Sequence, residues 1–143
     1  MRSLRLPVLT ALSAAFLSLA DLEGQQALAQ AAAPDWSTAQ TVEVDLTNFA
    51  FSPTQLALKP GVVYRLHFVN KTSGGHDFTA KDFFADAVVD PEDQANLKDG
   101  MVMLAGNQSA DVRLMAPKAG QYEARCTHFM HATLGMKGEV LVQ

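Results

Sequence analysis

Residues 121–142 read Gln-Tyr-Glu-Ala-Arg-Cys-Thr-His-Phe-Met-His-Ala-Thr-Leu-Gly-Met-Lys-Gly-Glu-Val-Leu-Val, with Cys126, His131 and Met136 inside the run. Residues 121–126 and about 137–142 have the composition of short strands. The stretch between them is therefore expected to be a hairpin loop. That loop carries a cysteine, a histidine and a methionine at offsets of zero, five and ten.

Outward from this hairpin, the chain continues to favour strands. Residues 41–47 alternate between apolar and polar side chains, and we expect Phe49 and Phe51 to continue the inward face. Further strands are expected at 55–59, 63–70, 101–104 and 109–114, a short helix within 78–87, and a loop over 90–100. Seven to eight short strands with frequent turns predict an all-β fold, a two-sheet antiparallel sandwich with one short helix.

The N-terminal segment is typical of an export signal. Two arginines lie within the first five residues, and residues 6–20 form an uncharged run rich in Leu and Ala. Ala27-Leu-Ala29 supplies the small residues that a signal peptidase needs, so we expect a signal peptide over 1–29. The run is too short for a permanent membrane span, which predicts a periplasmic protein without stable membrane insertion after cleavage. Residues 30–41 are interpreted as a flexible leader and 42–143 as one domain.

Composition narrows the functional classes further. The net charge is −4, which argues against nucleic acid as a partner. Cys126 is the only cysteine, so no disulfide can form within the chain. A lone cysteine in an exported protein indicates either an intermolecular bridge or a functional thiol, although a small buried apolar side chain is the common alternative. We expect a monomer.

The residue types of the hairpin loop suit one metal. A thiolate and a thioether are soft donors that favour Cu(I), whereas imidazole serves both Cu(I) and Cu(II). A further imidazole, His76, follows the Gly-rich segment Thr72-Ser-Gly-Gly75. Two His and one Cys with a weak axial Met are the ligands of blue-copper electron-transfer sites, whereas structural zinc sites usually contain several cysteines.

The sequence resembles the cupredoxin family of small type 1 (blue) copper proteins. The loop C-x4-H-x4-M followed by Lys-Gly is similar to that of the rusticyanin and auracyanin group. The upstream motifs extend the plastocyanin-like resemblance over about 42–142: Phe49-Ala-Phe-Ser-Pro53, Lys59-Pro-Gly61, Asn70, Ser73-Gly-Gly-His76 and Gly120-x-Tyr122. The resemblance implies a Greek-key β-sandwich that holds one Cu(I)/Cu(II) ion. By position it assigns His76, Cys126, His131 and Met136 as ligands.

Three departures from the family pattern concern the site. Asp77 stands where the family usually has Asn, and a carboxylate cannot donate the hydrogen bonds of an amide. Phe129-Met130 replaces the Pro-Gly that often precedes the second histidine. His128 is an additional histidine two residues after the cysteine, so it competes with His131 for the role of second imidazole.

Two functions remain open at this point. The preferred one is a soluble periplasmic electron carrier and not an enzyme. Redox proteins are expected to dock transiently on this carrier. For this role we expect His131 to be the exposed ligand, within a patch formed by Phe129, Met130, Ala132 and Leu134. The alternative is a copper-binding protein for tolerance or delivery. In that case Met101, Met103 and His128 could bind a second Cu(I), whereas core packing is the expectation for the two methionines otherwise.

Overall fold

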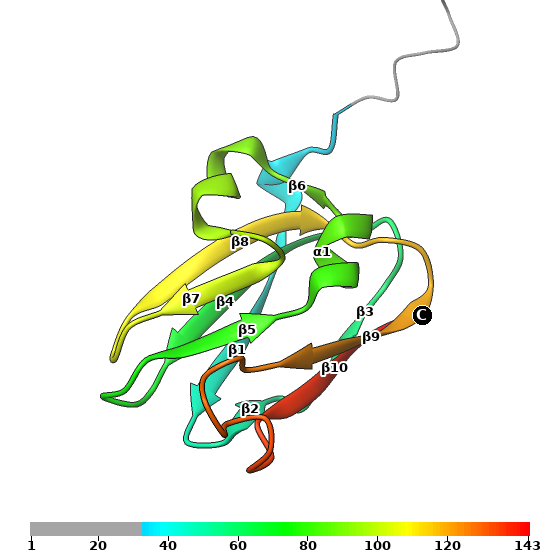
Figure 1. The fold of residues 1–143 in the computed structure, drawn as a ribbon. Helices are drawn as coiled ribbons and strands as arrows, with labels where there is room; N and C mark the ends of the chain where they lie inside the picture. Colours follow the sequence, from blue (N-terminus) through cyan, green and yellow to red (C-terminus); the bar gives the residue numbers. More distant parts are fainter. Residues whose placement is uncertain (1–32) are drawn as a thin grey trace, which may run out of the picture. The chain divides into compact units, whose positions relative to one another are not determined.

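The computed structural model describes residues 33–143, and within them ten strands form two five-stranded sheets (Figure 1). The first sheet has the order β2-β1-β4-β8-β6 and the second the order β3-β10-β9-β5-β7. The strands of the first sheet are β1 (Gln40–Thr47), β2 (Ala50–Ser52), β4 (Val63–Asn70), β6 (Val88–Val89) and β8 (Ser109–Met115). Those of the second are β3 (Gln55–Leu58), β5 (His76–Thr79), β7 (Met101–Leu104), β9 (Gly120–Arg125) and β10 (Lys137–Val142).

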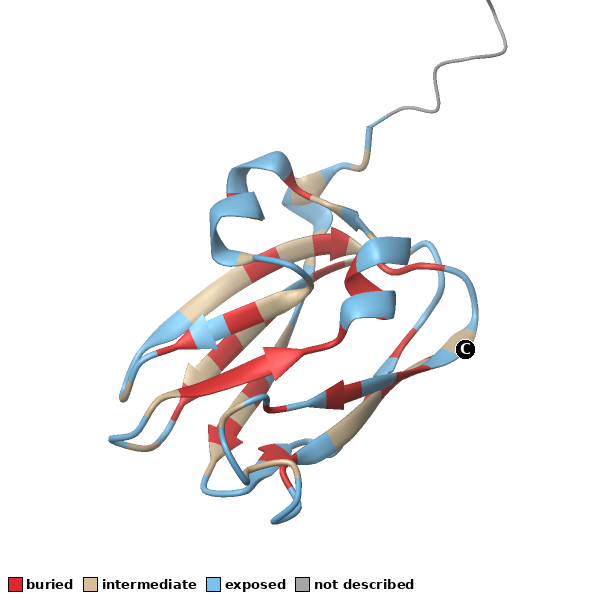
Figure 2. Cartoon of the chain, viewed as in Figure 1, coloured by how far each residue is buried: buried red, intermediate tan, exposed pale blue. Residues whose placement is uncertain are grey.

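The core lies between the sheets because the strands bury every second side chain. In β4, the residues Tyr64, Leu66 and Phe68 are buried, and Arg65 between them is exposed. In β10, Val140 and Val142 are buried against the same core. Figure 2 shows this alternation of buried and exposed positions along the strands. The all-β sandwich predicted from the alternation is therefore confirmed, but it is not purely antiparallel, because β1 pairs with β4 and β3 with β10 in parallel. The additional strands β2, β5 and β6 are short.

Three short helical segments complete the described fold. They are η3 (Trp36–Thr38), α1 (Lys81–Asp86) and η4 (Pro91–Asn96). α1 lies within the expected range 78–87 and buries Phe83 and Phe84 in the core. Arg113 of β8 holds the η4 segment through Asp93, at 2.8 Å between Nε and Oδ2. The predicted loop over 90–100 thus contains a short 3-10 helix, and the ion pair between Asp93 and Arg113 attaches this helix to β8.

Two expectations about single side chains differ from the structure. Phe49 does not continue the inward face of β1, because the chain turns before β2 and Phe49 lies exposed in that turn with φ +64°. Met101 and Met103 are not core residues either, since Val102 and Leu104 take the inward positions of β7. Met103 is 63% exposed on the outer face.

The expected signal peptide over 1–29 and the first residues of the leader lie outside the described residues. Among the helices of residues 33–143, none has the length and apolar character needed to span a bilayer.

Candidate metal centre

His76 follows a loop whose conformation is fixed by hydrogen bonds from the Asn70 side chain. Asn70 is the last residue of β4, and its buried side chain donates to the carbonyl oxygens of Gly74 at 2.7 Å and Ala105 at 3.0 Å. Its own Oδ1 accepts from the backbone N–H of Thr72 at 3.0 Å. One amide therefore joins the loop before His76 to the loop after β7, and His76 begins β5 directly afterwards.

The hairpin loop explains the spacing of the three C-terminal candidates. Cys126 follows β9, and its N–H donates to the carbonyl of Met136 at 3.1 Å, which closes the neck of the loop. Inside the loop, the N–H of Met136 donates to the carbonyl of His131 at 2.9 Å. His131 is thereby folded back over the neck. The five-residue spacings on each side of His131 are therefore those of a compact loop closed by backbone hydrogen bonds.

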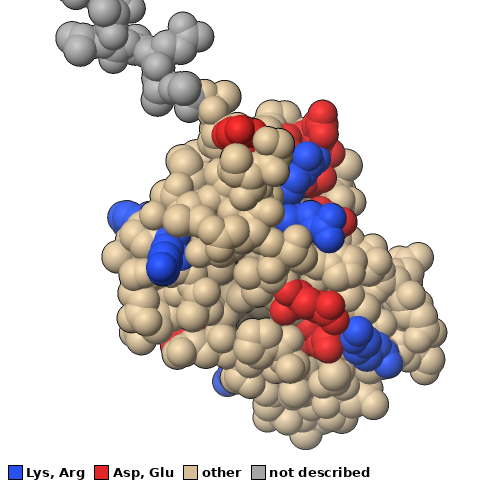
Figure 3. Space-filling model, turned by 180° about the vertical axis from the view of Figure 1, so that it is seen from behind, with Lys and Arg blue, Asp and Glu red and all other residues tan. Residues whose placement is uncertain are grey.

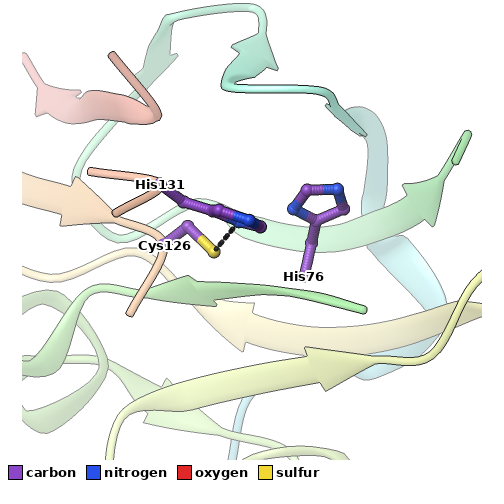
Figure 4. Close-up of side chains that lie close together, drawn as sticks. All are labelled: His76, Cys126 and His131. Carbon is purple, nitrogen blue, oxygen red and sulfur yellow. Dashed lines mark hydrogen bonds between the residues drawn. The ribbon is translucent and has the colours of Figure 1, made fainter. Parts of the chain in front are cut away.

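The side chains of His76, Cys126 and His131 converge from β5, the end of β9 and the loop (Figure 4). One donor atom from each lies within 4.8 Å of the other two. The Cys126 Sγ and His131 Nδ1 atoms are 3.5 Å apart, and the two imidazole ring centres are 4.9 Å apart. His76 and Cys126 are buried, whereas His131 is half-buried.

His76 carries the feature that best indicates a missing partner. Within the described residues, its Nδ1 is buried and has no hydrogen-bond partner. A buried polar atom of this kind is costly unless something binds it. Burial, followed by the nearby His131 and His128, lowers the pKa of His76. The ring therefore stays neutral near pH 7 and can act as a ligand. The donor set and the orphaned nitrogen both fit a copper ion.

The comparison with protein families agrees with this geometry. The family described as copper binding proteins, plastocyanin/azurin family, matches residues 38–143. The chain belongs to this family. Copper is therefore the cofactor of the centre, and the cupredoxin family expected from the sequence is confirmed.

Solved structures show the same cupredoxin fold. Auracyanin B is 31% identical to this cupredoxin, with a TM-score of 0.55, and the match covers 74% of this chain and 90% of that one. Auracyanin A, a blue copper protein from the green thermophilic photosynthetic bacterium Chloroflexus aurantiacus, is 21% identical with a TM-score of 0.53, over 72% of this chain and 98% of that one. A comparison with curated proteins finds no match.

A multicopper oxidase from Pseudomonas thermotolerans also shares the fold. It is 17% identical with a TM-score of 0.59, and the match covers 78% of this cupredoxin but 31% of the oxidase. At this identity the likeness concerns the fold alone. Within residues 33–143 the metal-type donors form two groups, His76–Cys126–His131 and Asp77–Cys126–His128. Both groups contain Cys126, so they describe a single centre.

The environment of the cysteine in this cupredoxin suits metal binding better than reaction with molecules in solvent. Cys126 is fully buried, and burial raises the pKa of its thiol. A metal ion binds the thiolate, so copper must displace the thiol proton when it enters. Burial also excludes the intermolecular disulfide that a lone cysteine left open.

Asp77 and His128 lie beside the cysteine on the outer face of β5. Asp77 is completely buried and accepts from the Thr127 N–H at 2.9 Å and from the Thr79 hydroxyl at 2.6 Å. His128 Nδ1 lies 2.9 Å from its Oδ2. Burial opposes ionisation of Asp77, but the hydrogen bonds from Thr79, Thr127 and His128 outweigh it and lower its pKa. Asp77 is therefore a carboxylate at neutral pH.

The remaining candidates divide between the interior and the surface. Met136 is fully buried at the neck of the loop. Of the predicted docking residues, Phe129 is 90% exposed, Met130 and Leu134 are exposed, and Ala132 is half-buried. Met101 approaches the centre from outside, with its Sδ 3.9 Å from the Thr127 hydroxyl.

One neighbour of the centre was missed by the sequence reasoning. Phe49 packs edge-on against His131, with ring centres 5.4 Å apart and an interplanar angle of 85°. Its motif, Phe49-Ala-Phe-Ser-Pro53, was recognised, but alternation placed the side chain inside. The signal that could have found it is the polar Thr47-Asn48 pair before it, which indicates a turn. We define the His131 patch as Phe49, Phe129, Met130, Ala132 and Leu134.

Proposed function

We propose that this protein is a periplasmic one-electron carrier whose copper ion is bound by His76, Cys126, His131 and Met136. The single observation that carries the proposal is the buried, unpartnered Nδ1 of His76, a residue that converges with Cys126 and His131 into one group of donors. The copper ion would supply the Cu(I)/Cu(II) couple. A thiolate and two imidazoles with a weakly bound thioether are acceptable to both oxidation states.

The surroundings of the donors support electron transfer. His76 begins a strand that is hydrogen-bonded into the second sheet, and Cys126 lies at the end of another strand of that sheet. Side chains held by such a framework move little when charge changes, so little reorganisation accompanies transfer. Because His131 is half-buried whereas Cys126 and His76 are buried, His131 is the donor nearest to a docked partner.

The His131 patch supports docking of a redox protein. Four of its members are exposed and apolar, and they adjoin the half-buried His131. Exposed apolar patches commonly mark interaction sites, and transient redox contacts bury little area. Export rests on the N-terminal signal pattern, and the periplasm is the compartment that we infer from it.

The proposal predicts an intense visible absorption after addition of Cu(II) to the wild-type protein. Charge transfer from the Cys126 thiolate to Cu(II) is the expected origin of the band. Cys126→Ser removes the soft sulfur and should abolish the band, and absorption spectra together with the copper content check this. A wild-type protein that binds copper without an intense visible band would refute the type 1 assignment.

A copper-handling role in tolerance or delivery remains the second candidate, and one observation favours it. Met103 is a thioether exposed to solvent on β7, and Met101 of the same strand face approaches Thr127 next to the centre. Exposed thioethers are available to Cu(I). A carrier retains a single ion through its redox cycle, whereas a copper-handling protein releases the ion or binds a second one.

A further inference from the structure

Asp77 connects the two segments that carry His76 and Cys126. Its carboxylate accepts from the Thr127 N–H at 3.0 and 2.9 Å, one distance for each oxygen, and from the Thr127 hydroxyl at 2.9 Å. The Thr79 hydroxyl, from the same strand as Asp77, donates at 2.6 Å. The carboxylate therefore fixes the residue that follows the cysteine relative to β5.

The same carboxylate creates an electrostatic difficulty at the sulfur. Asp77 Oδ2 lies 3.6 Å from Cys126 Sγ. A thiol can donate to this oxygen, but the copper-binding thiolate cannot, and a carboxylate has no proton to offer. With the metal bound, the Asp77 carboxylate and the Cys126 thiolate would face each other inside the protein, and both are negatively charged hydrogen-bond acceptors. A hydrogen-bond donor that reaches both atoms would relieve this contact.

His128 is placed to be that donor. Its Nδ1 lies 2.9 Å from Asp77 Oδ2 and 3.6 Å from Cys126 Sγ. Because a carboxylate oxygen only accepts, the Nδ1 atom of His128 must carry the hydrogen. Sulfur accepts hydrogen bonds at longer distances than oxygen does, so the same N–H reaches both atoms.

The ring of His128 is held in this orientation from both sides. It stacks on His131 with ring centres 5.5 Å apart and an interplanar angle of 20°. On its Nε2 side it packs against Gly75, where an added Cβ would lie 3.2 Å from Nε2. The contact with Asp77 is therefore not a chance orientation of a free surface side chain.

We propose that His128 is a positioning residue of the copper centre and not a ligand, and that its Nδ1–H bridges the Asp77 carboxylate and the Cys126 sulfur. The bridge supplies the donor that the family's usual asparagine would provide and that Asp77 lacks. This inference rests on the proposed type 1 copper site.

The bridge has a consequence for the reduction potential. Hydrogen bonds around the cysteine sulfur tune the potential of such centres. A donor withdraws electron density from the thiolate and weakens its donation to Cu(II), which raises the potential. Loss of the His128 donor should lower it. The unscreened Asp77 carboxylate acts in the same direction, because negative charge favours Cu(II).

The test combines removal of the donor with its rescue. His128→Ala should retain the intense visible band and one copper, but its reduction potential should be lower than that of the wild type. His128→Asn places an amide N–H near the former Nδ1 position and should keep the potential close to the wild-type value. In His128→Ala combined with Asp77→Asn, the new amide can donate to the sulfur, so the potential should return toward the wild-type value.

His67→Ala is the matched control. His67 Nδ1 lies 2.8 Å from Asp111 Oδ1, and the His67 side chain is 30% exposed, against 2.9 Å and 36% for His128 with Asp77. Because His67 lies on the outer face of the first sheet, its removal should leave potential and spectrum unchanged. If His128→Ala folds poorly, His128→Leu fills more of the ring's space without a donor and makes the same comparison.

The outcomes separate this inference from the proposed function. Absence of the intense visible band in the wild-type protein would refute the type 1 copper site itself. A normal wild-type band with an unchanged potential in His128→Ala or His128→Leu overturns the bridge alone, as does failure of Asp77→Asn to restore the potential. Loss of the band in every His128 variant, in protein whose circular dichroism shows the native fold, would make His128 a ligand and also overturn it.

Discussion

Met136 closes the hairpin loop through its backbone, and the ligand role that we propose for its side chain can be tested separately. Its carbonyl accepts from Cys126 N–H at 3.1 Å, and its N–H donates to the His131 carbonyl at 2.9 Å. Both bonds persist whatever side chain the residue carries. The buried thioether is the part of Met136 that we propose as the axial donor.

Met136→Leu should therefore tune the centre without destroying it. Leu and Met have similar volumes, so the cost in unfolding free energy should be below about 1.5 kcal/mol. The protein should still bind one copper, and its reduction potential should rise because the thioether no longer donates to Cu(II). Voltammetry and copper analysis check this. Complete loss of copper, or a fall in potential, would contradict the axial role.

Among the elements, the hairpin loop between β9 and β10 shows how far sequence reasoning reaches. The two flanking strands, and the hairpin loop that carries Cys126, His131 and Met136 between them, could be predicted from the sequence. The strands follow from composition, and the three soft or borderline donors in one short loop indicate a copper site. The apolar residues Phe129, Met130, Ala132 and Leu134 of this loop also indicated a docking surface, which stays a prediction. The structure adds Phe49 to that surface, from the turn between β1 and β2.

Other elements could not be predicted from the sequence, and the reasons are physical. β5 buries all four of its residues, because the sandwich covers its inner side and Thr127 and His128 lie against Asp77 on its outer side. Its sequence therefore shows no alternation. Met101 and Met103 were equally ambiguous, since Met-Val-Met-Leu is apolar at every position and either parity fits. Only the pairing of β7 with β5 decides which side faces the core.

The loop surface provides a test of docking. Placing Lys at Ala132 or Leu134 adds charge to the His131 patch, so electron exchange with a redox partner should slow while the visible spectrum stays unchanged. Val88→Lys is the matched control, because Val88 is also an exposed apolar residue, 45% exposed against 56% for Leu134, but belongs to β6. Stopped-flow measurement of partner reduction and of self-exchange would show the difference. Unchanged rates in both patch variants would exclude docking at this surface.

The charge of the whole molecule is distributed unevenly. Neither 46–58 nor 126–136, which supply the His131 patch, contains Asp, Glu, Lys or Arg. On the face shown in Figure 3, acidic and basic side chains lie mostly next to one another, and much of the surface carries neither. Lys71, for example, lies 3.2 Å from both Glu43 and Asp45. Such a surface supports the proposal that redox partners would be recognised by apolar contact rather than by long-range steering.

The number of copper ions per chain distinguishes a carrier from a copper-handling protein. Within residues 33–143, the two groups of metal-type donors share Cys126 and therefore describe one centre. A second Cu(I) would have to use the thioethers of Met101 and Met103, with or without His128. Because His128 Nδ1 is engaged by Asp77, we expect one copper per chain.

Titration of the reduced protein with Cu(I) against a competing chelator measures this number. One equivalent should bind in the wild type, and Met101→Leu combined with Met103→Leu should leave that value unchanged because both side chains lie outside the proposed ligand set. Met115→Leu, which changes a methionine of β8, controls for loss of a thioether elsewhere. A reproducible value of two equivalents, reduced to one by the Met101/Met103 double change but not by Met115→Leu, would identify a second site on β7. The protein would then belong to copper tolerance or delivery, because an electron carrier has no use for a second, solvent-exposed ion.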